Sequence, residues 1–353
     1  MKWVGGYETK EGALLARDEA RVALRKRIYI PPTERTVGEF LTTWLESVHR
    51  HQLKHTTYLR YEVLVRNYLL PGLGHLRLSD IKPTDIQKLY TGMLGSPGAS
   101  GRPIKARTVE HTGAILKKAL RYAVEVEGVL SFNPASRVPL PKSDAQAPAP
   151  WNRNELATFL ETAKSHRLFF FYRLSAYTGA RRGELLALRW SDFDGSYITI
   201  SKSRTLTGRA VIETNTTKGG KGGQRRVRLD RETIEMFVAH RKRQIEERLS
   251  MGSAWTETDY VFVQESGLPL DTGTTTALFQ KISKRAELRP TRLHDLRHLH
   301  ATELLRLGEP LHVVSDRLGH RDPLVTAKIY AHVTDEQAET ASNTFANGTR
   351  IAL

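Results

Sequence analysis

The sequence contains no cysteine among its 353 residues. This absence excludes disulfide bonds, thiolate metal sites and a cysteine nucleophile, so any covalent chemistry must use another side chain. The chain also lacks an apolar run long enough to span a membrane, and no basic and apolar signal peptide opens it. We therefore expect a cytoplasmic protein with no membrane partner.

Acidic residues are scarce relative to basic ones. The 38 aspartates and glutamates face 54 lysines and arginines, which leaves a formal net charge of +16. Such a surplus favours a polyanionic partner, with nucleic acid as the first candidate. Because 39% of the residues are hydrophobic and 26% are charged, the composition is that of a folded protein, and the basic surplus is expected on a structured surface.

The length predicts two or three compact units rather than one. In the first part, Thr36 and Glu39 have the spacing of a capping box, and apolar residues recur at helical spacing behind them. Further helices are expected over about 56–69, 84–94 and 108–126. The proline-rich stretch that ends at residue 150 is typical of an exposed linker between domains.

The part after the linker has a mixed pattern. Asn152 or Asn154 can cap a helix, and a second apolar helix follows. Residues 197–201 and 226–229 alternate like strands, with a glycine- and lysine-rich turn between them, and the chain from about Thr233 onward is mostly helical. The predicted fold class is mainly α with a small β-sheet: a helical domain followed by a mixed α+β domain.

Two segments of this second part place arginine beside a turn or a helix start. In Thr-Gly-Ala-Arg-Arg-Gly-Glu-Leu, over 178–185, glycines flank Arg181 and its neighbour, so a phosphate can come close to backbone and guanidinium together. His294 and Arg297 are three residues apart and share one helix face, where both can touch one phosphate. Taken singly, solvated arginines and a packed histidine are the commoner explanations.

Two further segments are Leu-Gly-His at 318–320 and Lys-Ile-Tyr-Ala-His at 328–332. Gly319 ends one helix while Asp322 and Pro323 begin the next, so His320 is expected at an exposed junction. Tyr330 follows ten residues later. Alone, this tyrosine would be taken for a core or interface aromatic.

In this order and spacing, the segments resemble the signature of the tyrosine recombinase family, the phage integrases. That signature is an arginine after Thr-Gly-x, a lysine in a β-hairpin, His-x-x-Arg, Leu-Gly-His, and a tyrosine nine or ten residues later. All five elements are present, and the resemblance covers essentially the whole chain. It implies an enzyme that cleaves and rejoins DNA through a 3′-phosphotyrosine, and so integrates or excises a mobile element.

The resemblance also implies roles for the site residues. Tyr330 would attack the scissile phosphate, while Arg181 and Arg297 would bind its non-bridging oxygens in place of metal ions. We therefore expect no metal and no other cofactor. His294 would act as acid or base near the tyrosine hydroxyl, and His320 would donate a hydrogen bond to the phosphate.

Supporting roles fall to residues around these. Glu184 would orient the neighbouring basic groups. The acid that protonates the departing 5′-oxygen is Lys218 or Lys221; Lys218 is favoured because it follows a Thr-Thr step, as family lysines commonly do. The remaining basic residues of this region are then expected to contact DNA: Lys221, Arg225, Arg226 and Arg228.

By the same resemblance, the chain is divided into domains. The predicted divisions are a remnant of an arm-type DNA-binding domain at 1–32, a helical, SAM-like, core-type DNA-binding domain at 33–140, a linker at 141–150, the catalytic domain at 151–335, and at 336–353 a tail that could pack on a neighbouring protomer. Double-stranded DNA attachment sites and a homotetramer on DNA, in a bacterial nucleoid, are the implied partners. A directionality factor and a host DNA-bending protein are compatible with the family but leave no mark in the sequence.

Three alternatives stay open at this point. His294-Asp295-Leu296-Arg297-His298 superficially copies a zinc-hydrolase helix. A DNA-binding regulator without catalysis would explain the charge, and a type IB topoisomerase would share the chemistry. The first leaves Arg181, His320 and Tyr330 unexplained, the second leaves the five retained elements unexplained, and the third lacks the two-domain layout.

Overall fold

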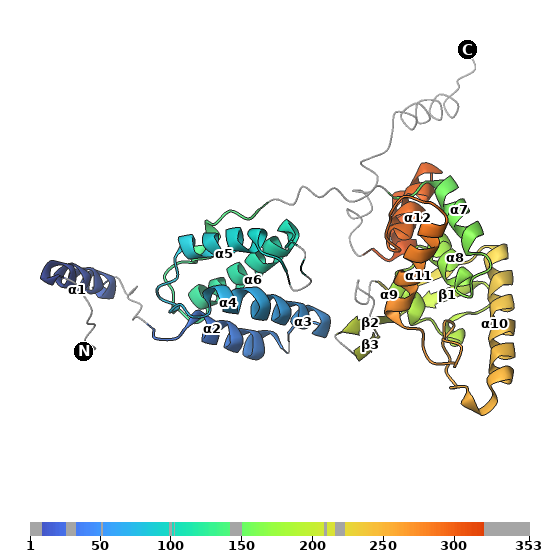
Figure 1. Cartoon of the computed structure of the whole chain (residues 1–353), viewed down its shortest axis with the longest axis horizontal. Coiled ribbons are helices and arrows are strands. Elements are labelled where there is room, and N and C mark those ends of the chain that lie inside the picture. The colour runs from blue at the N-terminus through green and yellow to red at the C-terminus, as the bar shows by residue number, and fades with distance from the viewer. Residues whose placement is uncertain are drawn as a thin grey trace, which may run out of the picture. The chain divides into compact units, whose positions relative to one another are not determined.

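The computed structural model describes residues 9–25, 33–50, 52–98, 101, 103–141, 150–207, 210–215 and 223–320. The chain divides into two compact units, Met1–Gln146 and Ala147–Leu353 (Figure 1). The division falls inside the segment predicted as a linker. No helix in the described part of the chain is long and apolar enough to cross a membrane.

The described residues of unit 1 form helices joined by short loops. They are α1 (Lys10–Arg25), α2 (Val37–Thr43), η1 (Trp44–His49), α3 (His55–Leu64), η2 (Val65–Leu69), α4 (Leu70–Leu73), α5 (Pro83–Gly95), α6 (Ala106–Glu125) and η3 (Pro134–Ser136). The first predicted helix starts where expected. Thr36 Oγ1 accepts from the amide of Glu39 at 3.1 Å, and the amide of Thr36 donates to the Glu39 carboxylate at 2.8 Å.

The other helices predicted for unit 1 are confirmed to within a few residues. The segment expected at 56–69 is α3 continued by the π-helical η2, and those expected at 84–94 and 108–126 are α5 and α6. Their apolar faces meet in one core, which includes Phe40, Trp44, Leu69, Leu116 and Leu120. Burial of these side chains, at roughly 25 cal/mol per Å² of apolar surface, is what stabilises the short helices.

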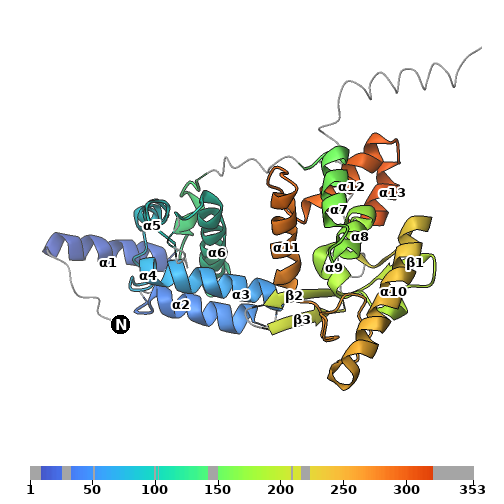
Figure 2. The ribbon, with the colours of Figure 1, turned by 45° about the vertical axis from the view of Figure 1, so that its right-hand side comes forward.

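Unit 2 is built mainly from helices around an aromatic core. They are α7 (Arg153–Ala163), α8 (Phe169–Thr178), α9 (Arg182–Leu186), η4 (Trp190–Asp192), α10 (Arg231–Met251), η6 (Gly252–Ala254), α11 (Thr272–Arg285), α12 (Asp295–Arg306) and α13 (Leu311–Leu318). Asn152, and not Asn154, caps α7 by accepting from the amide of Glu155 at 2.9 Å. Figure 2 shows α7, α8 and α12 grouped on one side, with the long α10 along another edge.

The core of unit 2 is held by aromatic rings in mutual contact. Phe159, Tyr172 and Phe279 meet with ring centroids 4.8–5.9 Å apart, within the favourable range for aromatic pairs. All three are fully buried. Because α7, α8 and α11 each contribute one ring, this cluster fixes α8, the helix that leads into the first arginine segment.

Two small antiparallel sheets complete the described part of unit 2. Strand β1 (Tyr197–Ile200) pairs with β4 (Arg225–Arg228), with Ile198 opposite Val227 on the buried face. In the sequence between β1 and β4, strand β2 (Ser203–Thr207) pairs with β3 (Ala210–Thr214) in a second sheet. The prediction of two strands separated only by a glycine- and lysine-rich turn was therefore wrong over 203–214.

The unpredicted hairpin has a physical explanation in its polar residues. Glu213 of β3 accepts from Tyr260 at 2.5 Å and from Arg189 at 2.9 Å, while Arg204 of β2 is buried and donates to the carbonyl of Leu186 at 3.2 Å. A strand that carries paired charges inward loses the simple alternation on which strand prediction rests. The β-branched residues on both sides of Gly208 were the signal available in the sequence.

Candidate active site

The predicted site residues that lie in the described part of the chain come from elements that meet in unit 2. Arg181 is the N-cap of α9, His294 is the N-cap of α12, and His320 follows Gly319, the C-cap of α13. The others are Glu184 of α9, Arg225 of β4 and Arg297 of α12. Contacts join α12 to α8 and α13, and α13 to β4, so segments far apart in the sequence surround one place.

Two glycines let the chain pass close to this place. Gly179, after α8, and Gly319, after α13, both have left-handed backbones, with φ of 62° and 66°. A Cβ on Gly179 would lie 2.5 Å from Leu318 Cδ2 and 2.9 Å from His300 Cδ2. Only glycine avoids both the backbone strain and these overlaps.

Arg297 is the most deeply placed cation of the site. Its side chain is buried, and its guanidinium donates to the carbonyl of Gly179 and to that of Leu318, each at 2.7 Å. Within the described residues no carboxylate forms an ion pair with it. Burial, followed by repulsion from Arg181 and Arg225, lowers the pKa of Arg297 to about 9. The group is charged at neutral pH and its charge is not fully compensated.

Glu184 is a buried carboxylate shared between two arginines. Its Oε1 accepts from Arg181 Nη1 at 2.8 Å, and its Oε2 accepts from Arg225 Nη2 at 2.8 Å and from the amide of Arg181 at 2.9 Å. Burial opposes ionisation, but Arg225 and then Arg181 outweigh it and hold the pKa of Glu184 below its usual range. The cluster contains three cations and one anion, so it has an excess of two positive charges. We call it the arginine cage (Arg181, Glu184, Arg225, Arg297).

The histidines around the arginine cage are held neutral. Loss of hydration, followed by the charges of Arg297 and Arg181, lowers the pKa of His320 to about 4. Loss of hydration and the nearby His298 lower the pKa of His294 to about 4 as well, although the residue as a whole is exposed. A neutral imidazole has one acceptor and one donor nitrogen, so both residues can exchange a proton or donate a hydrogen bond at neutral pH.

The zinc-helix alternative has no support in this geometry. His294 and His298 lie edge to face, with ring centroids 5.2 Å apart, but Asp295 accepts from Arg292 at 2.7 Å and from Thr291 at 3.2 Å. Among the described residues, no three of His, Asp and Glu are grouped so that they could hold a metal ion.

The structure places Arg225 differently from the exposed DNA contact expected of it. Only 5% of its side chain is exposed, and its three nitrogens donate to Glu184, to the carbonyl of Arg317 at 2.7 Å and to that of Gly223 at 3.2 Å. Arg226 and Arg228, on the opposite face of β4, are exposed as expected. Arg317, which contacts Arg225, was not singled out from the sequence.

Some predicted residues lie outside the described residues, namely Tyr330, Lys218, Lys221 and the tail 336–353. His300 of α12 lies beside Arg317, and its Nε2 accepts from Arg317 Nε at 3.1 Å. Burial, with Arg317 next, lowers the pKa of His300 to about 3.

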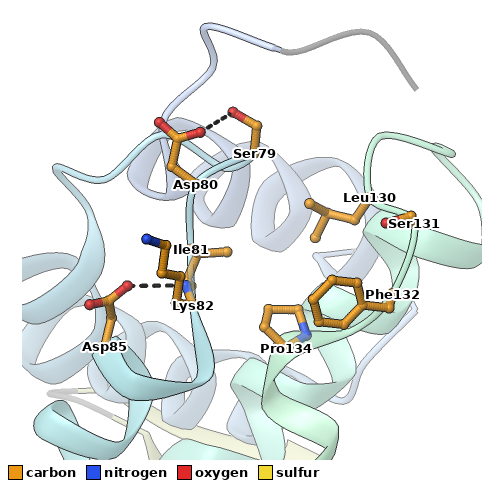
Figure 3. Close-up of a pocket in the computed structure, with 9 residues that line it drawn as sticks. All are labelled: Ser79, Asp80, Ile81, Lys82, Asp85, Leu130, Ser131, Phe132 and Pro134. Atoms are coloured by element: carbon orange, nitrogen blue, oxygen red, sulfur yellow. Dashed lines mark hydrogen bonds between the residues drawn. The ribbon is translucent and has the colours of Figure 1, made fainter. Parts of the chain in front are cut away.

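A separate cavity of about 570 Å³ lies in unit 1, between the start of α5 and the loop after α6 (Figure 3). Its polar groups are used locally, since Ser79 donates to Asp80 at 2.9 Å and the Lys82 amide donates to Asp85 at 3.0 Å. Lys82 is the one basic residue among those that line it. The cavity therefore lacks the clustered cations that a phosphate requires, and the arginine cage remains the candidate active site.

We expect acid to destabilise unit 2 in a window set by its histidines. Burial lowers the pKa of His240 to about 4, alongside about 3 for His300 and about 4 for His320. The unfolded chain binds these protons below pH 6.5, whereas the folded chain binds them only near pH 4. Stability should thus be full above about pH 6.5 and fall as the pH drops, by up to about 1.4 kcal/mol per pH unit for each fully buried histidine.

Urea unfolding at pH 7.5, 6.5, 5.5 and 5.0 measures this slope. The carboxylates with lowered pKa values titrate mainly below this range, so a decline between pH 6.5 and 5 reports the histidines. A free energy of unfolding that stays constant over this range would contradict the assignment of neutral, buried imidazoles.

Models of known protein families match both units of the chain. The model of the phage integrase family matches residues 151–337, and that of the phage integrase N-terminal SAM-like domain matches residues 36–94. A tyrosine recombinase XerC-like protein of Caldanaerobacter subterraneus subsp. tengcongensis is 32% identical, over 96% of this chain and 89% of its own length. An integrase of Saccharopolyspora erythraea is 25% identical over 85% of this chain and 79% of its own length.

Solved structures share the fold. The Tn1549 transposon integrase, in complex with transposon right end DNA, superposes with a TM-score of 0.73 at 20% identity, over 88% of this chain and 99% of that one. A lambda integrase dimer bound to a core site gives a TM-score of 0.63 at 18% identity, over 94% of this chain and 84% of that one. This chain belongs to the phage integrase family and is a site-specific DNA recombinase of mobile elements.

Proposed function

We propose that Tyr330 is the nucleophile of this recombinase and that Arg181 and Arg297 of the arginine cage bind the phosphate it attacks. The tyrosine oxygen forms a bond to phosphorus as the bond to the 5′-oxygen breaks, which leaves a 3′-phosphotyrosine and a free 5′-hydroxyl. Attack by the 5′-hydroxyl of a partner strand reverses the step and releases the tyrosine, so that no external energy source is needed.

The observation that carries the proposal is the uncompensated charge of the buried Arg297. A buried guanidinium without a full counter-ion is costly, and such a cost is retained where an anion binds. Its neighbour Arg181 is 20% exposed at the side chain, so the pair is open to a ligand on one side. Guanidinium forks match phosphate oxygens and stabilise charge that develops in the transition state.

The remaining roles follow from protonation state. His294, neutral at pH 7, can accept the proton of the tyrosine hydroxyl, and His320 can donate its one N–H to a phosphate oxygen. Lys218 is proposed as the acid that protonates the departing 5′-oxygen. Glu184 holds Arg181 in place and stays ionised through its two arginine partners.

The DNA partner is proposed to be a pair of attachment sites, held by unit 1 and unit 2 together. The lambda integrase that shares this fold has been solved as a tetramer bound to a Holliday junction, and we infer the same assembly here. The exposed Arg226 and Arg228 of β4 would contact the DNA backbone. Lys221 is proposed as a further DNA contact. A directionality factor and a host DNA-bending protein are proposed as additional partners.

Trapping of the covalent intermediate tests the nucleophile. The substrate is a nicked duplex that carries the joined ends of the mobile element. On cleavage, the short piece with the new 5′-hydroxyl dissociates, so religation is blocked and the adduct accumulates. We expect an adduct that survives detergent, with the oligonucleotide mapped by peptide mass to Tyr330. An adduct on another residue, or its absence on a duplex that the protein binds specifically, would overturn the proposal.

A further inference from the structure

Two arginines join strand β4 to the end of α13 by reciprocal hydrogen bonds. Arg225, the first residue of β4, donates from Nε to the carbonyl of Arg317 at 2.7 Å. In return Arg317 donates from Nη1 to the carbonyl of Arg228, the last residue of β4, at 3.2 Å. Each side chain therefore fixes the backbone of the other's element, and we call the pair the β4–α13 latch (Arg225, Arg317).

The β4–α13 latch is tied to the surrounding helices as well. Arg317 also donates to the carbonyl of Tyr177 at the end of α8 at 3.1 Å and to Nε2 of His300 in α12 at 3.1 Å. Arg225 also donates to Glu184 of α9. Four helices and one strand thus meet at these two side chains. An isolated ion pair of a surface arginine, by contrast, adds little to stability.

The β4–α13 latch lies directly against the turn that carries His320. A Cβ on Gly319 would come within 3.0 Å of both Cδ and Nη1 of Arg225, and within 3.1 Å of the carbonyl of Gly223. The turn therefore rests on the Arg225 side chain. A shift of that side chain moves Gly319, and with it the residue that follows.

The β4–α13 latch also affects the charge of the arginine cage. Arg225 occupies Oε2 of Glu184. If Arg225 were uncharged, Glu184 would be left to neutralise Arg181, and the excess of the cage would fall from two positive charges to one. Position and charge are separable at this residue, since lysine keeps the charge but lacks the planar fork that spans Glu184 and the Arg317 carbonyl.

We propose that Arg225 and Arg317 are positioning residues that hold the His320 turn against the arginine cage, so that their replacement slows DNA cleavage without weakening DNA binding. This inference rests on the proposed function of Tyr330 and the cage. Neither residue touches the phosphate. Their effect is on the placement of His320, for which an error of about 1 Å corresponds to roughly a hundredfold in rate.

The test uses three variants of the full chain with the nicked duplex. Arg317→Met and Arg225→Lys should each lower the cleavage rate by about ten- to a hundredfold, with DNA affinity within about twofold of the wild type. Arg225→Met should lower the rate at least as much and also raise the pKa of His320, followed by NMR of its imidazole, because Arg225 is one of the charges that lower this pKa. Arg317 is not among those charges, so its variant should leave the pKa of His320 in place.

The matched control is Arg231→Met. Arg231 begins α10 with its side chain 94% exposed, and among the described residues its ion pair is with Glu235 of the same helix. The substitution Arg231→Met removes the same charge from unit 2 and should leave the cleavage rate unchanged. A general effect of net charge would lower the rate of this control too, and that outcome would overturn the proposal.

The outcomes separate the inference from the proposed function. If the wild type forms no adduct on Tyr330, the proposed function fails. If the wild type forms this adduct and all three variants cleave at the wild-type rate, the inference about the β4–α13 latch fails and the proposed function stands. Should Arg225→Met be unfolded by circular dichroism, Arg317→Met and Arg225→Lys still decide, and full activity of Arg225→Lys would show that charge and not position is what matters.

Discussion

The substitution Tyr330→Phe is expected to abolish the covalent adduct, with cleavage reduced by about 10⁴-fold or more. Phenylalanine keeps the ring and its volume but removes the oxygen that bonds to phosphorus, and loss of the nucleophile is among the most severe changes an enzyme of this kind can undergo. DNA affinity should persist, because it arises from many phosphate contacts. Detergent-resistant adduct and gel-shift affinity, measured on the same nicked duplex, give the two quantities.

A second tyrosine of the chain provides a control for this substitution. Tyr172 is buried, and its hydroxyl donates to the carbonyl of Thr275 at 3.0 Å. Tyr172→Phe should cost about 1 kcal/mol of stability through the lost hydrogen bond and still form the adduct. An adduct formed by Tyr330→Phe would place the nucleophile elsewhere, whatever the control shows.

The helical part of the fold is largely visible in the sequence because its signals are local. The capping box of Thr36 and Glu39 and the cap at Asn152 act within one turn, and amphipathic spacing identifies α5 and α6 before any tertiary contact is known. The prediction was less successful for β2 and β3. Their charged residues are satisfied by Arg189, Tyr260 and backbone carbonyls far along the chain, and such partners cannot be read from a short segment.

The candidate site shows the same division. Arg181, His294, Arg297 and His320 are marked by their neighbours in the sequence, and the structure brings all four to one place. The buried positions of Arg225 and Arg317 are not marked in the sequence, because the difference between an exposed arginine and a buried one lies in its partners. A run such as Arg225-Arg226-Val227-Arg228 indicates a basic strand, but only the pairing of β4 with β1 shows which side chains point inward.

The substitution Arg297→Met is expected to reduce cleavage by at least about 10³-fold while leaving the protein folded. A single lost donor to a developing oxyanion corresponds to about 10²–10³ in rate, and this change removes a bidentate donor together with its charge. Arg297→Lys should recover little of the loss. One ammonium cannot bond to the carbonyls of Gly179 and Leu318 and to a phosphate in the geometry of a guanidinium.

The stability of Arg297→Met depends on two opposing effects of similar size. The carbonyls of Gly179 and Leu318 lose their donors, which costs about 1–3 kcal/mol for each group left unsatisfied. Against this, the variant no longer buries a charge that Arg181 and Arg225 repel, and the lowered pKa of Arg297 shows that this relief is also on the order of a few kcal/mol. We therefore expect a melting temperature within a few degrees of the wild type.

Inorganic phosphate separates this explanation from a purely structural role for Arg297. Phosphate should raise the melting temperature of the wild type, because an anion that binds the folded cage stabilises it by mass action. It should do so much less for Arg297→Met, whose cage has lost one of its two excess charges. A variant that is still stabilised by phosphate as strongly as the wild type would show that the anion binds elsewhere. One that is inactive, folded and insensitive to phosphate would establish that Arg297 binds the phosphate.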